Sequence, residues 1–127
     1  MAHKLVGRVK LADIAAGELV KLPYPPFDVL VTTVDGVAYA IEDSCNHAGA
    51  MLTEGARSVA RPHCVVCPMH GYVFDLRTGA LVAPRGLCAD QRRFETTLEG
   101  YEVVVWDPAD VRVEPITPSS SRRGSSA

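Results

Sequence analysis

Two short segments of the chain combine side chains that can bind a transition metal. Cys45 and His47 are separated by one residue, and Cys67 and His70 by two residues. Each segment supplies one thiolate and one neutral imidazole, which are ligand types that both iron and zinc accept. Together the two segments provide a complete set of four protein ligands for a small metal centre.

The residues around the second pair extend it into a longer motif. From Gly71 to Gly79 the chain reads GYVFDLRTG. The two segments therefore have the pattern C-x-H followed by C-P-x-H-G-x-x-F-D-x-x-T-G, and this pattern resembles that of the Rieske ferredoxin family. The resemblance extends over residues 4–106, and its specific motifs lie within 45–84.

The resemblance implies a cofactor and a role for each ligand. In the Rieske family two cysteines hold one iron of a 2Fe–2S cluster and two histidines hold the other. At the matching positions, Cys45 and Cys67 would bind one iron, and His47 and His70 the other. One such cluster per chain would make the protein a carrier of single electrons rather than an enzyme. The sequence shows no paired carboxylates, nucleophile elbow or phosphate-binding glycine loop that would indicate catalysis by this chain alone.

Residues missing from the motifs narrow the expected subfamily. Rieske proteins of respiratory cytochrome bc complexes carry an extra cysteine in each loop, whereas the matching positions here are Ala50 and Met69. Those proteins also place hydroxyl donors at positions that match Tyr72 and Phe74. Phe74 has no hydroxyl, so fewer side chains would donate hydrogen bonds to the cluster of this chain. This favours a reduction potential in the lower part of the Rieske range, about −150 mV.

The chain is therefore most similar to the soluble Rieske ferredoxins of bacterial oxygenase systems. The resemblance implies that a flavin-dependent reductase donates electrons to it. A terminal oxygenase, of the aromatic-ring-hydroxylating type, would accept them.

Other readings remain open on the residues alone. The same four side chains, or a set that includes Cys64, could hold zinc in a zinc-stabilised interaction module. A small Rieske subunit of a multisubunit oxidoreductase, such as assimilatory nitrite reductase, would carry the same motifs. Cys64 and Cys88 are expected to be buried thiols. Nineteen residues separate His47 from Cys67, more than the family leads us to expect, and we predict that the surplus is a surface insertion around 56–63.

Composition and charge argue against several kinds of partner. The chain has 127 residues, of which 47% are hydrophobic and 22% charged, as expected for one globular domain. Its formal net charge of −2 argues against nucleic-acid binding, which needs a basic face. No apolar run approaches the length of a membrane span, and no apolar signal segment follows Met1. We therefore predict a monomeric, cytoplasmic protein with no nucleic-acid or membrane partner.

Turn-forming residues divide the chain into short strands. Strands are expected over 4–10, 18–22, 28–34, 37–42, 59–66, 72–76, 80–82, 93–98 and 101–106, with a single helical turn at 11–15. Asp35-Gly36 between two apolar runs predicts a two-residue hairpin turn. Pro23 is expected to end the second strand, because it cannot donate a ladder hydrogen bond.

Such a series of short strands predicts an all-β fold. The family resemblance makes this more specific: stacked antiparallel sheets with a small cluster-binding subdomain. We expect the Rieske domain to span 1–116, with its cluster-binding loops within 43–87. Residues 117–127, rich in Ser and Arg and without apolar periodicity, are expected to form a disordered tail.

The ligand assignment predicts that His70→Ala abolishes the visible absorption and EPR spectrum of the cluster, because one iron loses half of its protein ligands. His3→Ala, which removes a histidine outside both motifs, should leave the spectrum unchanged. A His70→Ala protein with the wild-type spectrum would show that the assignment is wrong.

Overall fold

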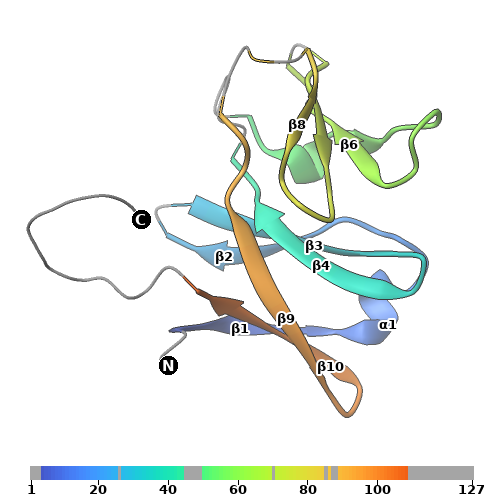
Figure 1. Ribbon diagram of the computed structural model, residues 1–127. Helices are drawn as coiled ribbons and strands as arrows, with labels where there is room; N and C mark the ends of the chain where they lie inside the picture. The colour runs from blue at the N-terminus through green and yellow to red at the C-terminus, as the bar shows by residue number, and fades with distance from the viewer. Residues whose placement is uncertain are drawn as a thin grey trace, which may run out of the picture.

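The computed structural model describes residues 4–25, 27–44, 50–69, 71–84, 86 and 89–108. Within these ranges nearly all regular structure is β, arranged as two stacked antiparallel sheets (Figure 1). No helix of the described residues is long and apolar enough to cross a membrane. The all-β prediction is confirmed.

The larger sheet has six strands in the order β1-β10-β9-β4-β3-β2. Its first and last strands along the chain, β1 and β10, pair with each other, and the short helix α1 (Leu11–Ile14) follows β1. The six strands are β1 (Lys4–Lys10), β2 (Val20–Tyr24), β3 (Phe27–Val34), β4 (Val37–Glu42), β9 (Arg93–Glu99) and β10 (Glu102–Asp107).

The smaller sheet is inserted between β4 and β9 and lies above the larger sheet in Figure 1. It follows the short 3-10 helix η1 (Leu52–Glu54), and its strand order is β5-β6-β7-β8. Its strands are β5 (Ala56–Arg57), β6 (Cys64–Val66), β7 (Val73–Asp75) and β8 (Leu81–Ala83). The chain therefore leaves the six-stranded sheet after Glu42 and returns to it at Arg93.

The turn between β3 and β4 has the predicted geometry. Asp35 has a φ angle of 53° and Gly36 one of 81°, so both central residues adopt the left-handed conformation that a two-residue hairpin requires. Both flanking strands pair in register from Val34 with Val37 up to Val29 with Glu42. The turn thus sets the register of β4, and the chain continues from the last residue of β4, Glu42, into the smaller sheet.

Two details of the strand prediction are wrong. β2 continues through Pro23 to Tyr24, and the missing N–H is tolerated because β2 is an edge strand. The strand expected over 59–66 is confined to β6, Cys64–Val66, and a further strand, β5, lies before it and pairs with it through Ala56 and Arg57. A two-residue strand has no periodicity, so its sequence gives no strand signal.

Two apolar layers hold the fold together. The layer between the two sheets, called here the intersheet core, consists of buried Leu30, Val34, Ile41, Leu52, Val65, Cys67, Phe74 and Leu76. The layer inside the curved larger sheet, called the inner core, consists of Val9, Ile14, Val29, Val31, Ala40, Phe94, Val103 and Val105. Successive residues of β3 face alternate layers. β3 is therefore buried on both faces.

Candidate metal centre

Cys67 is the one predicted ligand whose placement the structure describes; Cys45, His47 and His70 lie outside the described residues. Cys67 directly follows β6 and is a free cysteine with 1% of its surface exposed. It packs in the intersheet core. The thiol therefore lies at the boundary between the packed interior and the turn that follows it.

A tight turn follows Cys67. The N–H of Cys67 donates to the carbonyl oxygen of Tyr72 (2.7 Å), and the N–H of Gly71 donates to the carbonyl oxygen of Cys67 (3.1 Å). Gly71 has a φ angle of 73°, which explains why the motif has glycine there. Pro68 and Met69 are exposed, with 57% of the Met69 surface accessible. A buried thiol is thus followed directly in the chain by two exposed apolar residues.

The base of the first predicted loop is closed by Asp43. Its carboxylate accepts hydrogen bonds from the N–H (2.7 Å) and the hydroxyl (2.8 Å) of Thr53, and its carbonyl oxygen accepts from the N–H of Leu52 (2.8 Å). Burial raises the pKa of Asp43, although the Thr53 hydrogen bonds oppose this. Ser44 and Met51 form an isolated antiparallel bridge. The two ends of the loop that contains Cys45 are therefore held side by side.

Gln91 connects this loop base to the second motif. Its Nε2 donates to the carbonyl oxygens of Glu42 (2.9 Å) and Ser44 (2.7 Å), and its backbone N–H donates to the carbonyl oxygen of Gly79 (2.7 Å). Gln91 is 3% exposed. Sequence reasoning missed this residue, because it lies outside both motifs and no local pattern marks it.

The F-D-x-x-T-G part of the motif has a structural role. Phe74 is fully buried in the intersheet core. The Asp75 carboxylate accepts from the backbone N–H of Arg77 (2.8 Å) and from its Nη2 (3.0 Å). Burial by itself would raise the pKa of Asp75, but the hydrogen bonds and charge of Arg77 outweigh it and lower the pKa. These contacts fix the turn between β7 and β8.

Gly79 of this motif is required by two independent constraints. Its φ angle is 82°, and a Cβ at this position would lie 2.2 Å from the carbonyl oxygen of Gln91. The close approach permits the hydrogen bond between the two backbones. Gly79 therefore allows Gln91 to connect the second motif with the base of the loop that contains Cys45.

A second group of possible ligands does not form a favourable metal site. His63, Cys64 and Asp75 place ligand atoms within 4.8 Å of one another. However, Arg77 already donates to both oxygens of Asp75. Burial, and then the nearby charge of Asp75, raise the pKa of the Cys64 thiol and so disfavour the thiolate that zinc binds. Cys64 is the buried strand thiol that was predicted, whereas Cys88 lies outside the described residues.

Comparison with known proteins places the chain in a family. Residues 8–87 match the family model of the Rieske [2Fe-2S] domain. The ferredoxin component of biphenyl 2,3-dioxygenase from Rhodococcus jostii (strain RHA1) is 36% identical over 93 residues, which are 73% of this chain and 83% of that protein.

Solved structures agree with the sequence matches. The ferredoxin of carbazole 1,9a-dioxygenase from Nocardioides aromaticivorans IC177 is 27% identical, with a TM-score of 0.72 over 82% of this chain and 98% of its own. A chain of the complex of reduced oxygenase and oxidized ferredoxin in carbazole 1,9a-dioxygenase is also 27% identical, with a TM-score of 0.68 over 80% and 94% of the two chains.

The chain belongs to the Rieske [2Fe-2S] family. It is a ferredoxin-type electron-transfer protein whose cofactor is a 2Fe–2S cluster, not an enzyme and not a zinc module. The buried free thiol of Cys67, followed by a glycine turn and an exposed tip, fits a cluster held close to the protein surface.

Gly79→Ala should destabilise the protein more than Gly36→Ala does. Both glycines have nearly the same positive φ angle, but no atom lies within 4 Å of a Cβ at Gly36. We expect about 1–2 kcal/mol of strain in either variant and about 1–3 kcal/mol more at Gly79 from the clash with Gln91. The measurement is the urea midpoint under anaerobic conditions; equal midpoints would contradict the role given to Gln91.

Glu42→Gln should stabilise the protein at neutral pH. Glu42 is 7% exposed, and burial raises the pKa of its carboxyl despite the hydrogen bond and charge of Arg92. Because the folded-state pKa lies above the unfolded value, about 4.3, ionised Glu42 favours unfolding at pH 7. This penalty fades as the pH falls through the folded pKa towards the unfolded value.

The urea midpoint of Glu42→Gln should therefore exceed that of the wild type at pH 7, with a difference that shrinks towards pH 4.5. Glu54→Gln, which changes an exposed glutamate in η1, serves as the control and should show no such pH-dependent gain. A Glu42→Gln effect that is independent of pH would contradict the burial argument.

Proposed function

We propose that this chain carries electrons from a flavin-dependent reductase to a terminal oxygenase of the aromatic-ring-hydroxylating type. The observation that carries this proposal is the 36% identity to the ferredoxin component of biphenyl 2,3-dioxygenase over 83% of that protein. Among the structural relatives, a complex in carbazole 1,9a-dioxygenase contains both an oxygenase and a ferredoxin. That pairing supports the same kind of acceptor for this chain.

The proposed ligands are the four motif residues, with Cys45 and Cys67 on one iron and His47 and His70 on the other. The cluster, when bound, accepts and releases one electron at a time. Support comes from the free, buried thiol of Cys67 and from the two hydrogen bonds that shape the turn after it. The exposed Pro68 and Met69 give the tip an apolar surface for contact with a partner.

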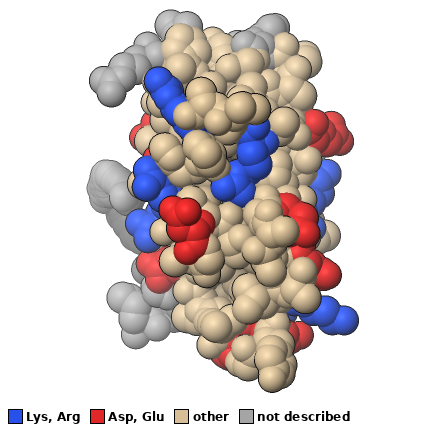
Figure 2. Space-filling view, turned by 90° about the vertical axis from the view of Figure 1, so that its right-hand side faces the viewer, with Lys and Arg blue, Asp and Glu red and all other residues tan. Residues whose placement is uncertain are grey.

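Charge is unevenly divided between the segment that contains the smaller sheet and the rest of the described chain. Segment 50–84 has a net charge of +1, from Arg57, Arg61 and Arg77 against Glu54 and Asp75. The rest of the described chain has six basic and eleven acidic residues, a net charge of −5. On the face seen in Figure 2, basic atoms gather near the middle and acidic atoms lie mostly around and below them. The acidic excess therefore lies in the part of the described chain outside the smaller sheet, and it includes Glu42 and Asp43 just before Cys45.

We also propose that the carrier is a cytoplasmic monomer whose Rieske domain spans 1–116. The smaller sheet lies within 43–87, the range proposed for the cluster-binding loops. The proposed disordered tail, 117–127, lies outside the described residues. A free carrier should dock transiently with its partners, whereas a subunit of a nitrite-reductase type of enzyme would copurify with a large subunit.

The proposal predicts that the purified chain supports turnover when mixed with the reductase and oxygenase components of a biphenyl 2,3-dioxygenase system. We expect an EPR signal of a mixed Cys/His cluster after dithionite reduction and about two irons per chain. A chain with the cluster but without oxygenase turnover, and with a stable large subunit, would favour the multisubunit alternative. A colourless, zinc-containing chain would contradict the cofactor assignment.

A further inference from the structure

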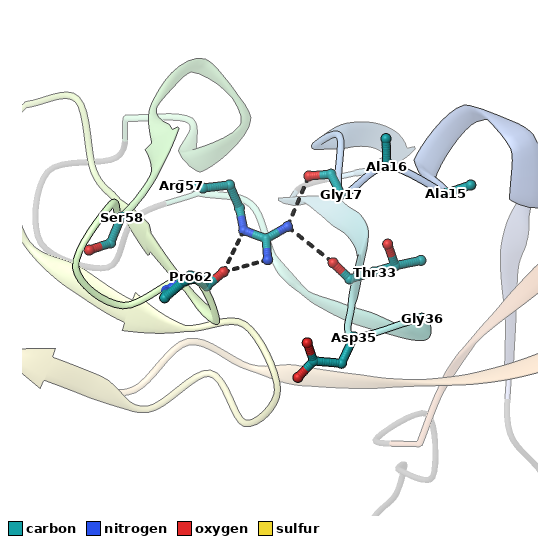
Figure 3. A pocket seen from close by; sticks show the side chains of 9 residues that line it. All are labelled: Ala15, Ala16, Gly17, Thr33, Asp35, Gly36, Arg57, Ser58 and Pro62. Carbon is teal, nitrogen blue, oxygen red and sulfur yellow. Dashed lines mark hydrogen bonds between the residues drawn. The ribbon is translucent and has the colours of Figure 1, made fainter.

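Arg57 of β5 reaches from the four-stranded sheet to the six-stranded sheet (Figure 3). Its Nη1 donates to the carbonyl oxygens of Gly17 (2.9 Å) and Thr33 (3.0 Å). On its other edge, Nε donates to the carbonyl oxygen of Pro62 (2.8 Å), and Nη2 donates to the same oxygen. One planar guanidinium thus connects the segment after α1, strand β3 and the loop before β6.

The backbone groups that accept from Nη1 are held by contacts of their own. Thr33 is 4% exposed, and its hydroxyl donates to the carbonyl oxygen of Ile14 (2.7 Å). Gly17 has a φ angle of 85°, and a Cβ there would lie 2.9 Å from Nη1 of Arg57. Because Gly17 has no side chain, the guanidinium of Arg57 can lie close to its backbone. A charged donor makes these hydrogen bonds stronger than neutral ones.

The chain passes between the two sheets twice, and we call these two connections the crossings. The Arg57 contact lies at the opposite end of the sheets from them. Both crossings, after Glu42 and before Arg93, are at the far end of β4 from the β3–β4 turn (Figure 1). Thr33 is next to that turn and pairs with Ala38, four residues before Glu42, so Arg57 acts roughly 13 Å from the crossings, at about 3.3 Å per residue along β4. The crossings attach the smaller sheet at one end, and Arg57 fastens the other.

Apolar packing reaches this end of the sheets through Val34, and the hydrogen bonds of Arg57 are added to it. A cavity of about 400 Å³ lies beside the guanidinium; it is lined by Thr33 of β3, Arg57 of β5 and residues of the adjoining turns, including Ala16, Asp35 and Ser58 (Figure 3). The intersheet core is apolar and therefore non-directional. The guanidinium fork has a fixed geometry, so its hydrogen bonds supply the direction that apolar contact lacks.

We propose that Arg57 is a positioning residue for electron transfer. It fastens the end of the four-stranded sheet that is remote from the chain connections and thereby fixes the orientation of the turn after Cys67 relative to the rest of the protein. This inference rests on the proposed function, because orientation matters only when the tip docks with a protein partner. A misplacement of about 1 Å can cost as much as about 10²-fold in rate where geometry is critical.

The structural test compares Arg57→Ala with Arg61→Ala, which removes an exposed arginine from the loop that follows β5. Residual dipolar couplings of backbone N–H groups are measured on the oxidised, cluster-containing protein in a dilute alignment medium. In the wild type and in Arg61→Ala, one alignment tensor should fit both sheets. In Arg57→Ala, the four-stranded sheet should need its own, weaker tensor.

A single tensor that fits both sheets of Arg57→Ala would overturn the proposal. Arg57→Lys keeps the charge but not the fork, and its ammonium cannot donate to Pro62 and to Gly17 and Thr33 together. It should therefore resemble Arg57→Ala. Loss of the cluster spectrum in both Arg57 variants would also overturn the proposal, because Arg57 would then be required for the fold rather than for orientation.

The functional test uses the reconstituted oxygenase assay. Arg57→Ala should lower kcat/KM for electron transfer to the oxygenase by about 10- to 10²-fold, with unchanged reduction by dithionite and an unchanged EPR spectrum. Equal transfer by Arg57→Ala and wild type would contradict the positioning role and leave the proposed function intact. Failure of the wild type to transfer electrons would contradict the proposed function, while the dipolar couplings still decide whether Arg57 orients the sheet.

Discussion

The apolar contact between the two sheets is the constraint on which the site depends. The strands of the smaller sheet have two or three residues each, too few to be stable without a surface to pack on. β3 and β4 supply that surface through Leu30, Val34 and Ile41, and burial of each such side chain contributes about 1.5–3 kcal/mol. Cys67 lies in the same layer, so the packing that stabilises the smaller sheet also places a proposed ligand.

Features with a local cause could be predicted from the sequence. Asp35 and Gly36 predicted a hairpin because their preference for positive φ acts within two residues. The alternation of short apolar runs and turn residues predicted an all-β fold for the same reason. Pro23 and β5 were predicted wrongly, because their outcomes depend on the neighbouring strands: an edge position allows the proline, and pairing with β6 creates β5.

The same distinction applies to the site. The four ligands could be predicted because the residues of each motif are close together in the chain. The family resemblance then implied that they hold a 2Fe–2S cluster. Gln91 and Arg57 were not visible, since their acceptors at Glu42 and Gly17 lie 49 and 40 residues away in the chain. The region around Arg57 was predicted to be a surface insertion, and Arg57 contributes hydrogen bonds between the sheets. Long-range contacts of single polar side chains leave no periodic signal in a sequence.

The two cores differ in the stretch of chain that they need. All buried residues of the intersheet core lie between Leu30 and Leu76, whereas those of the inner core extend from Val9 to Val105. The larger sheet is completed only when β1 pairs with β10, as in the match of Lys4 with Asp107. Because closing a long loop costs more entropy than closing a short one, contacts within the contiguous middle segment are favoured early in folding. During synthesis, the layer that contains Cys67 can therefore assemble before the ribosome has released the last strand of the sheet that supports it.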